Sequence, residues 1–251
     1  MTPPSKNSLI IGNYDRIAAA SPLDIVISGR YASSAFGYVR RLGFFLAEVM
    51  ELGPQDRVLD AGCSVGLYHP ILAAKVRQLV GVDASPHSID RARKRYAKLA
   101  NVEYRVANLL ELDARDFPTG FDKILCYSVV HFLDGREDLQ ALLANLAGML
   151  RERQGLIYLG EVRDRELYHG FQAKRETQNW PSVRDWKFRM LRAVQNWFLP
   201  KKGLSPGVAP TLFTEGEIRG AVCKLGGTCE RIEQASWHPF YNTCVDYRLR
   251  F

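Results

Sequence analysis

Short apolar runs and longer amphipathic stretches alternate along the middle of the chain. Apolar runs of five or six residues, bounded by glycine or polar residues, are typical of strands buried on both faces of a parallel sheet. The stretches between them repeat apolar residues at spacings of three and four, as a helix with one buried face does. The pattern predicts strands at 57–61, 78–83, 102–107, 122–127 and 155–161, and helices at 67–77, 87–99 and 136–151.

The flanking segments are read in the same way. Apolar spacing predicts a helix over 38–52, which Gly53 and Pro54 end. Thr214 and Glu217 have the spacing of a capping box and predict a helix from 215 to about 225. The runs 228–234 and 243–251 read as closing strands, whereas residues 1–12, with two prolines and many polar side chains, are expected to be disordered.

Length and composition suit one sizeable domain over residues 1–251, since 47% apolar residues can supply a single core. We divide it into an N-terminal cap segment, 1–40, and an insert, 163–213. No stretch is apolar enough for a signal peptide or a membrane span, so we expect a cytoplasmic protein. The five cysteines lack C-x-x-C spacing, which favours reduced thiols and no metal site.

Two acidic residues close neighbouring predicted strands. Residues 58–66 read V-L-D-A-G-C-S-V-G, and residues 80–83 read V-G-V-D. Asp60 and Asp83 should therefore face one crevice, because parallel strands end at the same edge of a sheet. Gly62 and Gly66 allow a ligand to lie against the main chain, and Asp83 can accept two hydrogen bonds from a ribose diol. This arrangement predicts a site for an adenosine-like ligand.

The glycine spacing argues against a nicotinamide dinucleotide, whose G-x-G-x-x-G fingerprint is incomplete after Gly62. The stretch 58–66 instead resembles the first motif of class I S-adenosylmethionine-dependent methyltransferases. The resemblance continues in the family's order through 80–85, 104–110, 121–132 and 149–160. It implies a doubly wound α/β fold with a seven-stranded, mostly parallel sheet in the order 3-2-1-4-5-7-6.

Two residues depart from the family pattern. Ser64 stands where the middle glycine is usual, and we expect it to fit with a negative φ. Asn108 replaces the acid that usually grips the adenine amino group, although its amide oxygen can still accept a hydrogen bond.

The resemblance implies S-adenosylmethionine as cofactor and S-adenosylhomocysteine as product. The residues that it assigns to cofactor binding are Tyr14, Asp60, Gly62, Cys63, Gly66, Asp83, Ala84, Asn108, Leu109 and Tyr127. Methyl transfer depends mainly on holding donor and acceptor in line, but a hydroxyl acceptor gains from a base. His131, just beyond the fourth strand, is the first catalytic candidate, and Glu161, at the end of the fifth strand, is the second.

The net charge of +7 comes mainly from the insert. Residues 163–202 hold ten Lys and Arg against four Asp and Glu. Within them, 183–199 show an apolar helical face with two tryptophans beside a basic face. This helix either packs on the body as a lid or meets an anionic acceptor or a membrane surface.

The leading hypothesis is O-methylation of a small molecule or glycan, which the basic insert suggests is anionic or lipid-linked. An RNA methyltransferase is an alternative, because basic surfaces attract phosphate. Against it, the sequence contains neither the motif of the amino-methylating enzymes nor an appended RNA-binding module. A non-catalytic protein that binds the cofactor is the third hypothesis. The sequence leaves the oligomeric state open.

Overall fold

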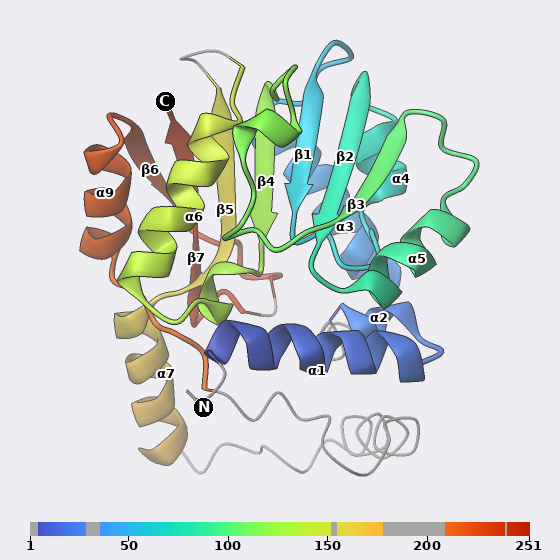
Figure 1. Cartoon of the computed structure of the whole chain (residues 1–251). Coiled ribbons are helices and arrows are strands. Elements are labelled where there is room, and N and C mark those ends of the chain that lie inside the picture. Colours follow the sequence, from blue (N-terminus) through green and yellow to red (C-terminus); the bar gives the residue numbers. More distant parts are fainter. Residues whose placement is uncertain (1–4, 29–35, 152–154, 178–208, 239) are drawn as a thin grey trace.

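The computed structural model describes residues 5–28, 36–151, 155–177, 209–238 and 240–251. Its centre is a seven-stranded sheet in the order β3-β2-β1-β4-β5-β7-β6 (Figure 1). Only the pairs with β7 are antiparallel. The predicted fold class and strand order are therefore confirmed. The strands are β1 (Arg57–Ala61), β2 (Gln78–Asp83), β3 (Val102–Val106), β4 (Lys123–Tyr127), β5 (Leu156–Arg163), β6 (Thr228–Ile232) and β7 (Cys244–Arg250).

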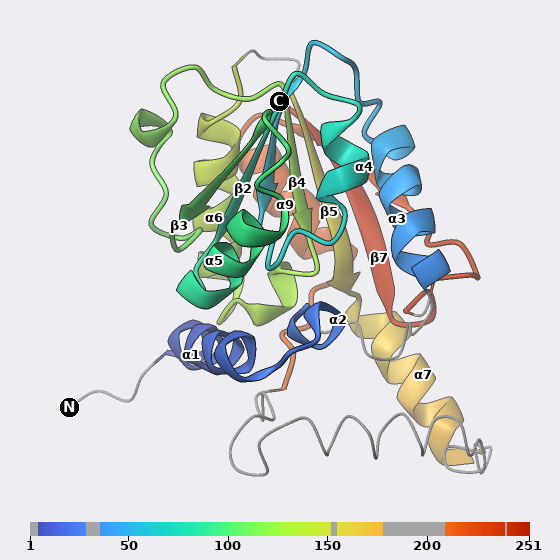
Figure 2. The same ribbon diagram turned by 90° about the vertical axis from the view of Figure 1, so that its right-hand side faces the viewer.

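Helices cover both faces of the sheet (Figure 2). The helices α3 (Phe36–Val49) and α4 (His69–Ala73) share one apolar cluster, and α6 (Arg136–Gly148) and α9 (Glu215–Lys224) share the other. Successive strand residues enter opposite clusters: Leu125 packs with α3 and α4, whereas Ile124 and Cys126 pack with α6 and α9. This period of two is the reason that the central strands are apolar throughout.

The first residues of the chain are not as predicted. Residues 6–12, expected to be disordered, open the helix α1 (Lys6–Ala20), whose N-cap Ser5 accepts a hydrogen bond from the Ser8 N–H. Ile10 and Ile17 are buried, so a packing face stabilises the helix. In Figure 1, α1 crosses the carboxyl edge of the sheet, and the short α2 (Asp24–Ile27) follows it.

Asp15 fastens α1 to the start of α5 (Pro86–Arg95). One carboxylate oxygen accepts from the Ser85 hydroxyl at 2.7 Å, and the other lies 2.9 Å from His87 Nδ1. Burial alone would raise the pKa of Asp15, but the hydrogen bonds from Ser85 and His87 lower it below its ordinary value. The helix is thus held in place over the carboxyl edge by a charged anchor.

Four helices end earlier than predicted. The predicted helices 38–52 and 136–151 end at Val49 and Gly148. The predicted helix 67–77 is only α4, because a turn from Gly62 occupies the preceding residues and the Arg77 N–H already bonds to the Asp56 carbonyl. The predicted helix 87–99 ends at Arg95. The predicted strand 102–107 ends at Val106. The predicted strands 228–234 and 243–251 are shorter in the structure, where they are β6 and β7.

The turn after β1 uses residues with positive φ. Gly62 has φ +86°, and a Cβ there would come within 2.3 Å of the Val129 side chain, so glycine is required. Ser64 has φ +49°, which contradicts the expectation of a negative φ. The Ser64 N–H donates to Asp83 Oδ2 at 2.8 Å, and this hydrogen bond holds the residue in its left-handed conformation.

A β-bulge interrupts the pairing of β5 with β7. The register moves from Leu159 opposite Tyr247 to Val162 opposite Val245, and Glu161 takes φ +54°. Asp246 holds the bulge, since its Oδ1 accepts the Glu161 N–H at 2.8 Å. Leu159 and Val162 both enter the cluster under α6 and α9. The extra residue therefore reverses the alternation, and Arg163 comes to the opposite face.

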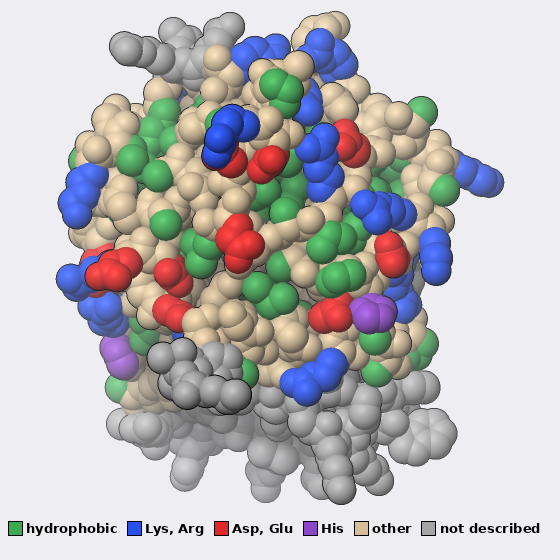
Figure 3. All heavy atoms as spheres, in the orientation of Figure 1, with side chains coloured by type: hydrophobic (Ala, Val, Ile, Leu, Met, Phe, Trp, Pro, Cys, Tyr) green, Lys and Arg blue, Asp and Glu red, His purple; other side chains and the backbone are tan. Residues whose placement is uncertain are grey.

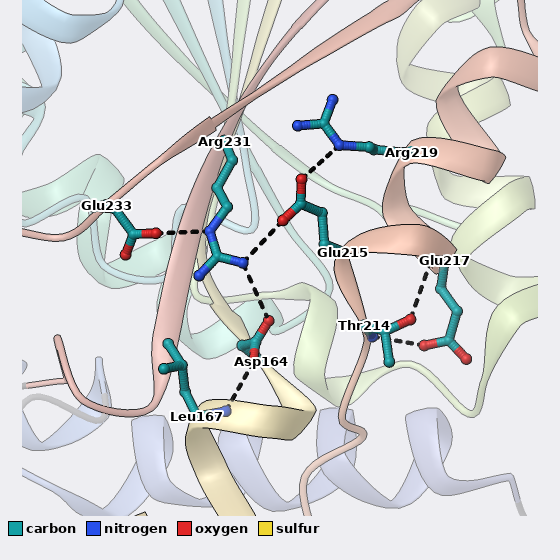
Figure 4. A network of polar contacts seen from close by, with 8 residues as sticks. All are labelled: Asp164, Leu167, Thr214, Glu215, Glu217, Arg219, Arg231 and Glu233. Carbon is teal, nitrogen blue, oxygen red and sulfur yellow. Dashed lines mark hydrogen bonds and ion pairs between the residues drawn. The ribbon is translucent and has the colours of Figure 1, made fainter. Parts of the chain in front are cut away.

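The two described ends of the insert 163–213 are joined to each other. The Phe213 N–H donates to the Arg163 carbonyl at 3.0 Å, and the Arg165 N–H donates to the Phe213 carbonyl at 2.9 Å. Asp164 caps the helix α7 (Arg165–Thr177) through the Leu167 N–H at 2.9 Å (Figure 4). The predicted helix at 183–199 lies outside the described residues.

A polar network fixes the joined ends to the body. Arg231 of β6 lies between Asp164, at 3.9 Å, and Glu215, at 2.9 Å (Figure 4). The predicted capping box is present at the start of α9, where Thr214 and Glu217 satisfy each other's backbone N–H groups. Within the described residues, no helix is long and apolar enough to cross a membrane.

We predict that Ser64→Gly stabilises the protein. A left-handed conformation costs an L-residue about 1–2 kcal/mol, of which the greater chain entropy of glycine cancels about half. The free energy of unfolding should rise by about 0.5–1 kcal/mol, measured by denaturant titration. Ser8→Gly, at an exposed helical position with negative φ, is the control and should destabilise. A lower stability of Ser64→Gly would contradict the strain at this turn.

We predict that Asp246→Ala destabilises the protein strongly. The change leaves two buried donors, the Glu161 N–H and the Tyr158 hydroxyl, without an acceptor. The expected loss is about 2–4 kcal/mol, or a melting temperature lower by about 5–15 °C. Asp246→Asn keeps one acceptor oxygen and should lose less than half as much. Equal losses for the two variants would show that the carboxylate does not hold the bulge.

Candidate functional site

A cavity of about 250 Å³ opens at the carboxyl edge of the sheet, beneath α1. Its walls come from the turn after β1, the ends of β2 and β4, the loop after β3 and the end of β5. Side chains of α1, including Asn7 and Tyr14, cover it from the side opposite the sheet. The cavity therefore has the position in which open α/β sheets bind ligands.

Of the predicted cofactor residues, eight line the cavity: Tyr14, Gly62, Cys63, Asp83, Ala84, Asn108, Leu109 and Tyr127. Asp60 and Gly66 do not. Of the two catalytic candidates, His131 lines the cavity and Glu161 does not.

Asp83 is the charged group at the floor of the cavity. Its Oδ2 accepts the Ser64 N–H at 2.8 Å, and its Oδ1 accepts the Ser85 N–H at 2.9 Å. Burial raises the pKa of Asp83 above its ordinary value, against the lowering effect of these two hydrogen bonds. Each oxygen keeps a further lone pair, so the carboxylate can accept two more hydrogen bonds from a ligand.

Asp60 lies behind the cavity wall in a buried chain of side chains. Its Oδ2 lies 2.9 Å from His69 Nε2, and His69 Nδ1 lies 2.7 Å from the Tyr104 hydroxyl. The His69 and Tyr104 rings stack with centroids 5.3 Å apart. Gly66 has φ +69° and lies against the same His69 ring. Asp60 and Gly66 thus contact the His69 ring behind the turn and do not line the cavity.

Cys63 and Asn108 line the two sides of the same region. Burial raises the pKa of the Cys63 thiol well above its ordinary value, so the thiol stays protonated. The Asn108 amide oxygen accepts the Leu110 N–H at 3.2 Å, and its amide nitrogen donates to Glu111 at 2.9 Å. These bonds fix the amide and leave one lone pair on its oxygen for a ligand.

The other end of the cavity is walled by Tyr127, His131, Phe132, Arg163 and Phe240. Tyr127 lies flat against Gly160 of the neighbouring strand, where a Cβ would come within 1.9 Å of the ring. His131 is 7% exposed and sits in a short 3₁₀ helix, Val130–Phe132, whose backbone accepts the Thr211 N–H at 2.9 Å. This end combines four rings with the guanidinium of Arg163, whereas Asp83 and Asn108 line the opposite end.

Glu161 belongs to a buried polar cluster behind Tyr127. Its Oε1 lies 3.2 Å from His238 Nε2, which also lies 2.7 Å from the Tyr127 hydroxyl and 2.9 Å from that of Tyr38. The Phe240 N–H donates to His238 Nδ1 at 3.3 Å, which leaves the proton of a neutral ring on Nε2. Glu161 is therefore linked to the cavity wall through His238 and Tyr127.

Sequence reasoning missed Arg163, His238 and Phe240. Arg163 was counted only as part of the basic insert, and the other two lie in the connection between β6 and β7, where no motif marks them. The one available signal was that Arg163 follows the fifth predicted strand by two residues, at the edge where ligands bind. The bulge that turns it toward the cavity has no signature in the sequence.

The cavity fits S-adenosylmethionine at its nucleoside end. Asp83 offers acceptors for a ribose diol, Leu109 and Leu110 supply apolar walls beside Asn108 for a base, and the backbone of Gly62 and Cys63 is exposed at the turn. Within the described part of the chain, no group of three His, Cys, Asp or Glu side chains is arranged to hold a metal ion. All five cysteines are free thiols.

Comparison with known families gives one domain match. Residues 59–159 match the model of the methyltransferase domain. This range contains the turn after β1, Asp83, Asn108, Tyr127 and His131.

Two curated relatives illustrate the sequence similarity. Nodulation protein S of Rhizobium tropici is 29% identical over 112 residues, which are 45% of each chain. A 23S rRNA (uracil(1939)-C(5))-methyltransferase of Stenotrophomonas maltophilia is 37% identical over 83 residues, or 31% of this chain and 18% of that protein. The alignments thus span less than half the length of these relatives.

Solved structures share the fold over more of the chain. The N-methyltransferase NodS of Bradyrhizobium japonicum, in complex with S-adenosylhomocysteine, superposes with a TM-score of 0.53 at 18% identity, covering 84% of this chain and 85% of its own. The DhpI–SAM–HEP complex gives a TM-score of 0.64 at 17% identity, with both chains covered completely.

The domain match and the strand order agree, and they confirm the family suggested by residues 58–66 and 80–83. Residues 59–159 thus form a methyltransferase domain, on a seven-stranded sheet with the strand order that the resemblance to the class I S-adenosylmethionine-dependent methyltransferases implied.

Proposed function

We propose that the protein transfers the methyl group of S-adenosylmethionine to an oxygen or nitrogen of a small-molecule or glycan acceptor. The observation that carries the proposal is the single cavity that joins Asp83 at a nucleoside end to His131 and Tyr127 at a polar end. Bound there, the cofactor supplies an electrophilic methyl on a sulfonium. The chain's own side chains bind the nucleoside, exclude water and orient the acceptor.

The cavity also argues against a non-catalytic protein. Its wall includes His131 and Tyr127, whose polar side chains can contact an acceptor, and residues 59–159 match a methyltransferase domain. The sequence favoured an oxygen acceptor. We include nitrogen because the chain is similar to NodS, which is an N-methyltransferase.

An RNA acceptor receives less support. The similarity to the rRNA methyltransferase covers 31% of this chain. On the described surface in Figure 3, basic side chains alternate with acidic ones and form no continuous basic face. Contact of residues 183–199 with membranes stays a prediction, because these residues lie outside the described part of the chain.

His131 is the proposed general base for a hydroxyl acceptor, because it is the imidazole that lines the cavity. Glu161 takes a positioning role in this proposal. Its carboxylate holds His238 beneath Tyr127, which forms the wall of the cavity.

The first test measures S-adenosylhomocysteine binding to Asp83→Ala by calorimetry. Two lost hydrogen bonds to a charged acceptor, at about 1.5–3 kcal/mol each, should weaken binding about 100-fold or more. Asp83→Asn keeps one acceptor oxygen, so its affinity for S-adenosylhomocysteine should lie between those of the wild type and Asp83→Ala. Asp90→Ala, an exposed carboxylate on α5, is the matched control and should bind as the wild type does.

Since Asp83 also accepts two backbone N–H groups, circular dichroism and thermal unfolding accompany each titration. A folded Asp83→Ala protein with wild-type affinity would remove the basis of the assignment.

The second test identifies the acceptor and then the base. Deuterated-methyl S-adenosylmethionine is offered with small-molecule and glycan pools, and mass spectrometry locates the label on oxygen or nitrogen. With a hydroxyl acceptor, His131→Gln should lower kcat about 10²-fold or more and flatten the pH profile, with cofactor affinity unchanged. Glu161→Gln should lower kcat less. An unchanged kcat in His131→Gln would exclude it as the base.

A further inference from the structure

The side chain of Arg163 is an unusual wall for a cavity that binds a cationic sulfonium. A guanidinium carries a permanent positive charge and five donors, so its placement in a binding cavity calls for an anionic partner. No acidic side chain in the described part of the chain forms an ion pair with Arg163. Its role is therefore not explained by the protein's own contacts.

One edge of the guanidinium has no acceptor among the described residues. Nη1 donates to the Thr243 hydroxyl at 2.9 Å, and the group lies over the Phe240 ring at 4.7 Å. Nε is buried and has no hydrogen-bond partner. A buried donor without an acceptor is destabilising, and an oxygen of a ligand would supply the missing acceptor. Nε and Nη2 together form the edge that binds an oxyanion through two parallel hydrogen bonds.

Three features of the fold hold this edge in position. The bulge at Glu161 turns Arg163 away from the apolar cluster that receives Val162. The Arg163 carbonyl accepts the Phe213 N–H, and its strand partner is Cys244. Thr243 and Phe240, which contact the guanidinium, lie in the turn before β7, where the Thr243 N–H donates to the Phe240 carbonyl at 2.9 Å.

The arginine is also at the correct end of the cavity. It lines the wall with Phe240, Tyr127 and His131, whereas Asp83 and Asn108 line the nucleoside end. An anion bound to Arg163 would thus lie away from the ribose and the adenine, and the two anionic groups to compare are the carboxylate of the cofactor's amino-acid part and an anionic group of the acceptor.

We propose that Arg163, seated between Phe240 and Thr243, is a specificity residue that binds a carboxylate or phosphate group of the methyl acceptor. The proposal rests on the proposed function and narrows its acceptor to an anionic small molecule or glycan. A phosphate and a carboxylate share the paired oxygens that this edge of the guanidinium binds. Methyl transfer itself is unchanged: the carbon–sulfur bond breaks, the bond to the acceptor forms, and the acceptor's proton leaves to a base.

The test uses the full chain with and without saturating S-adenosylhomocysteine. Inorganic phosphate and acetate are titrated separately, by calorimetry in a buffer without other oxyanions, and the two probes distinguish phosphate from carboxylate recognition. We expect at least one probe to bind the wild-type complex. Arg163→Gln should weaken that binding at least about 10-fold, and Arg163→Lys, which keeps the charge but not the paired donors, should be intermediate.

Arg115→Gln, at an exposed arginine whose side chain is 89% accessible, is the control and should bind the probes as the wild type does. Phe240→Leu, which removes the ring beneath the guanidinium, should weaken probe binding while keeping the fold. The affinity for S-adenosylhomocysteine should change less than about threefold in every variant.

Three results would overturn the proposal. They are no binding of either probe to the wild type, wild-type probe affinity in Arg163→Gln, and a loss of S-adenosylhomocysteine affinity in Arg163→Gln as large as the loss for the probes. The third would assign the arginine to the cofactor. Failure of the wild type to bind S-adenosylhomocysteine counts instead against the proposed function, and the titrations without it still measure whether anion binding depends on Arg163.

Discussion

The carboxylate of Asp83 joins the two backbone segments on which the site depends. It closes strand β2 and accepts one N–H group from the turn after β1 and one from the start of α5. Because both segments bond to the same side chain, their separation is set by the size of one carboxylate. This arrangement buries a charged group, and burial raises the pKa of Asp83 above its ordinary value. Ser64 accepts a left-handed conformation as part of the same arrangement.

A second buried carboxylate has the same kind of task at the other end of the cavity. Asp246 also has a pKa raised by burial, and it accepts the Glu161 N–H where β5 bulges. The bulge reverses the alternation of side chains, so that Val162 stays in the core and Arg163 comes to the cavity. The nucleoside end and the acceptor end are thus each positioned by a carboxylate that binds backbone N–H groups.

The sequence predicted the parts of this molecule that repeat a periodic pattern. Apolar runs predicted the buried strands. The position of Asp83 at the end of one run predicted its place at the carboxyl edge, because parallel strands end at the same edge of a sheet. The start of α9 at the end of the insert was also predicted, since the capping box of Thr214 and Glu217 has a fixed spacing. These features depend on local sequence alone.

The remaining features depend on contacts between distant segments. The helix α1 forms because Ile10 and Ile17 pack on the body and Asp15 bonds to Ser85. Ser64 has a positive φ because Asp83, 19 residues away, accepts its N–H. Asp60 was expected beside the cofactor but bonds to His69. His238 and Phe240 reach the site from a connection that carries no motif.

The most direct measurement is a crystal structure with S-adenosylhomocysteine bound. The account predicts both ribose hydroxyls within hydrogen-bond distance of Asp83, with the sulfur directed toward His131, Tyr127 and Arg163. Density for the nucleoside away from Asp83, or a sulfur facing a wall with no space before Arg163, would contradict it.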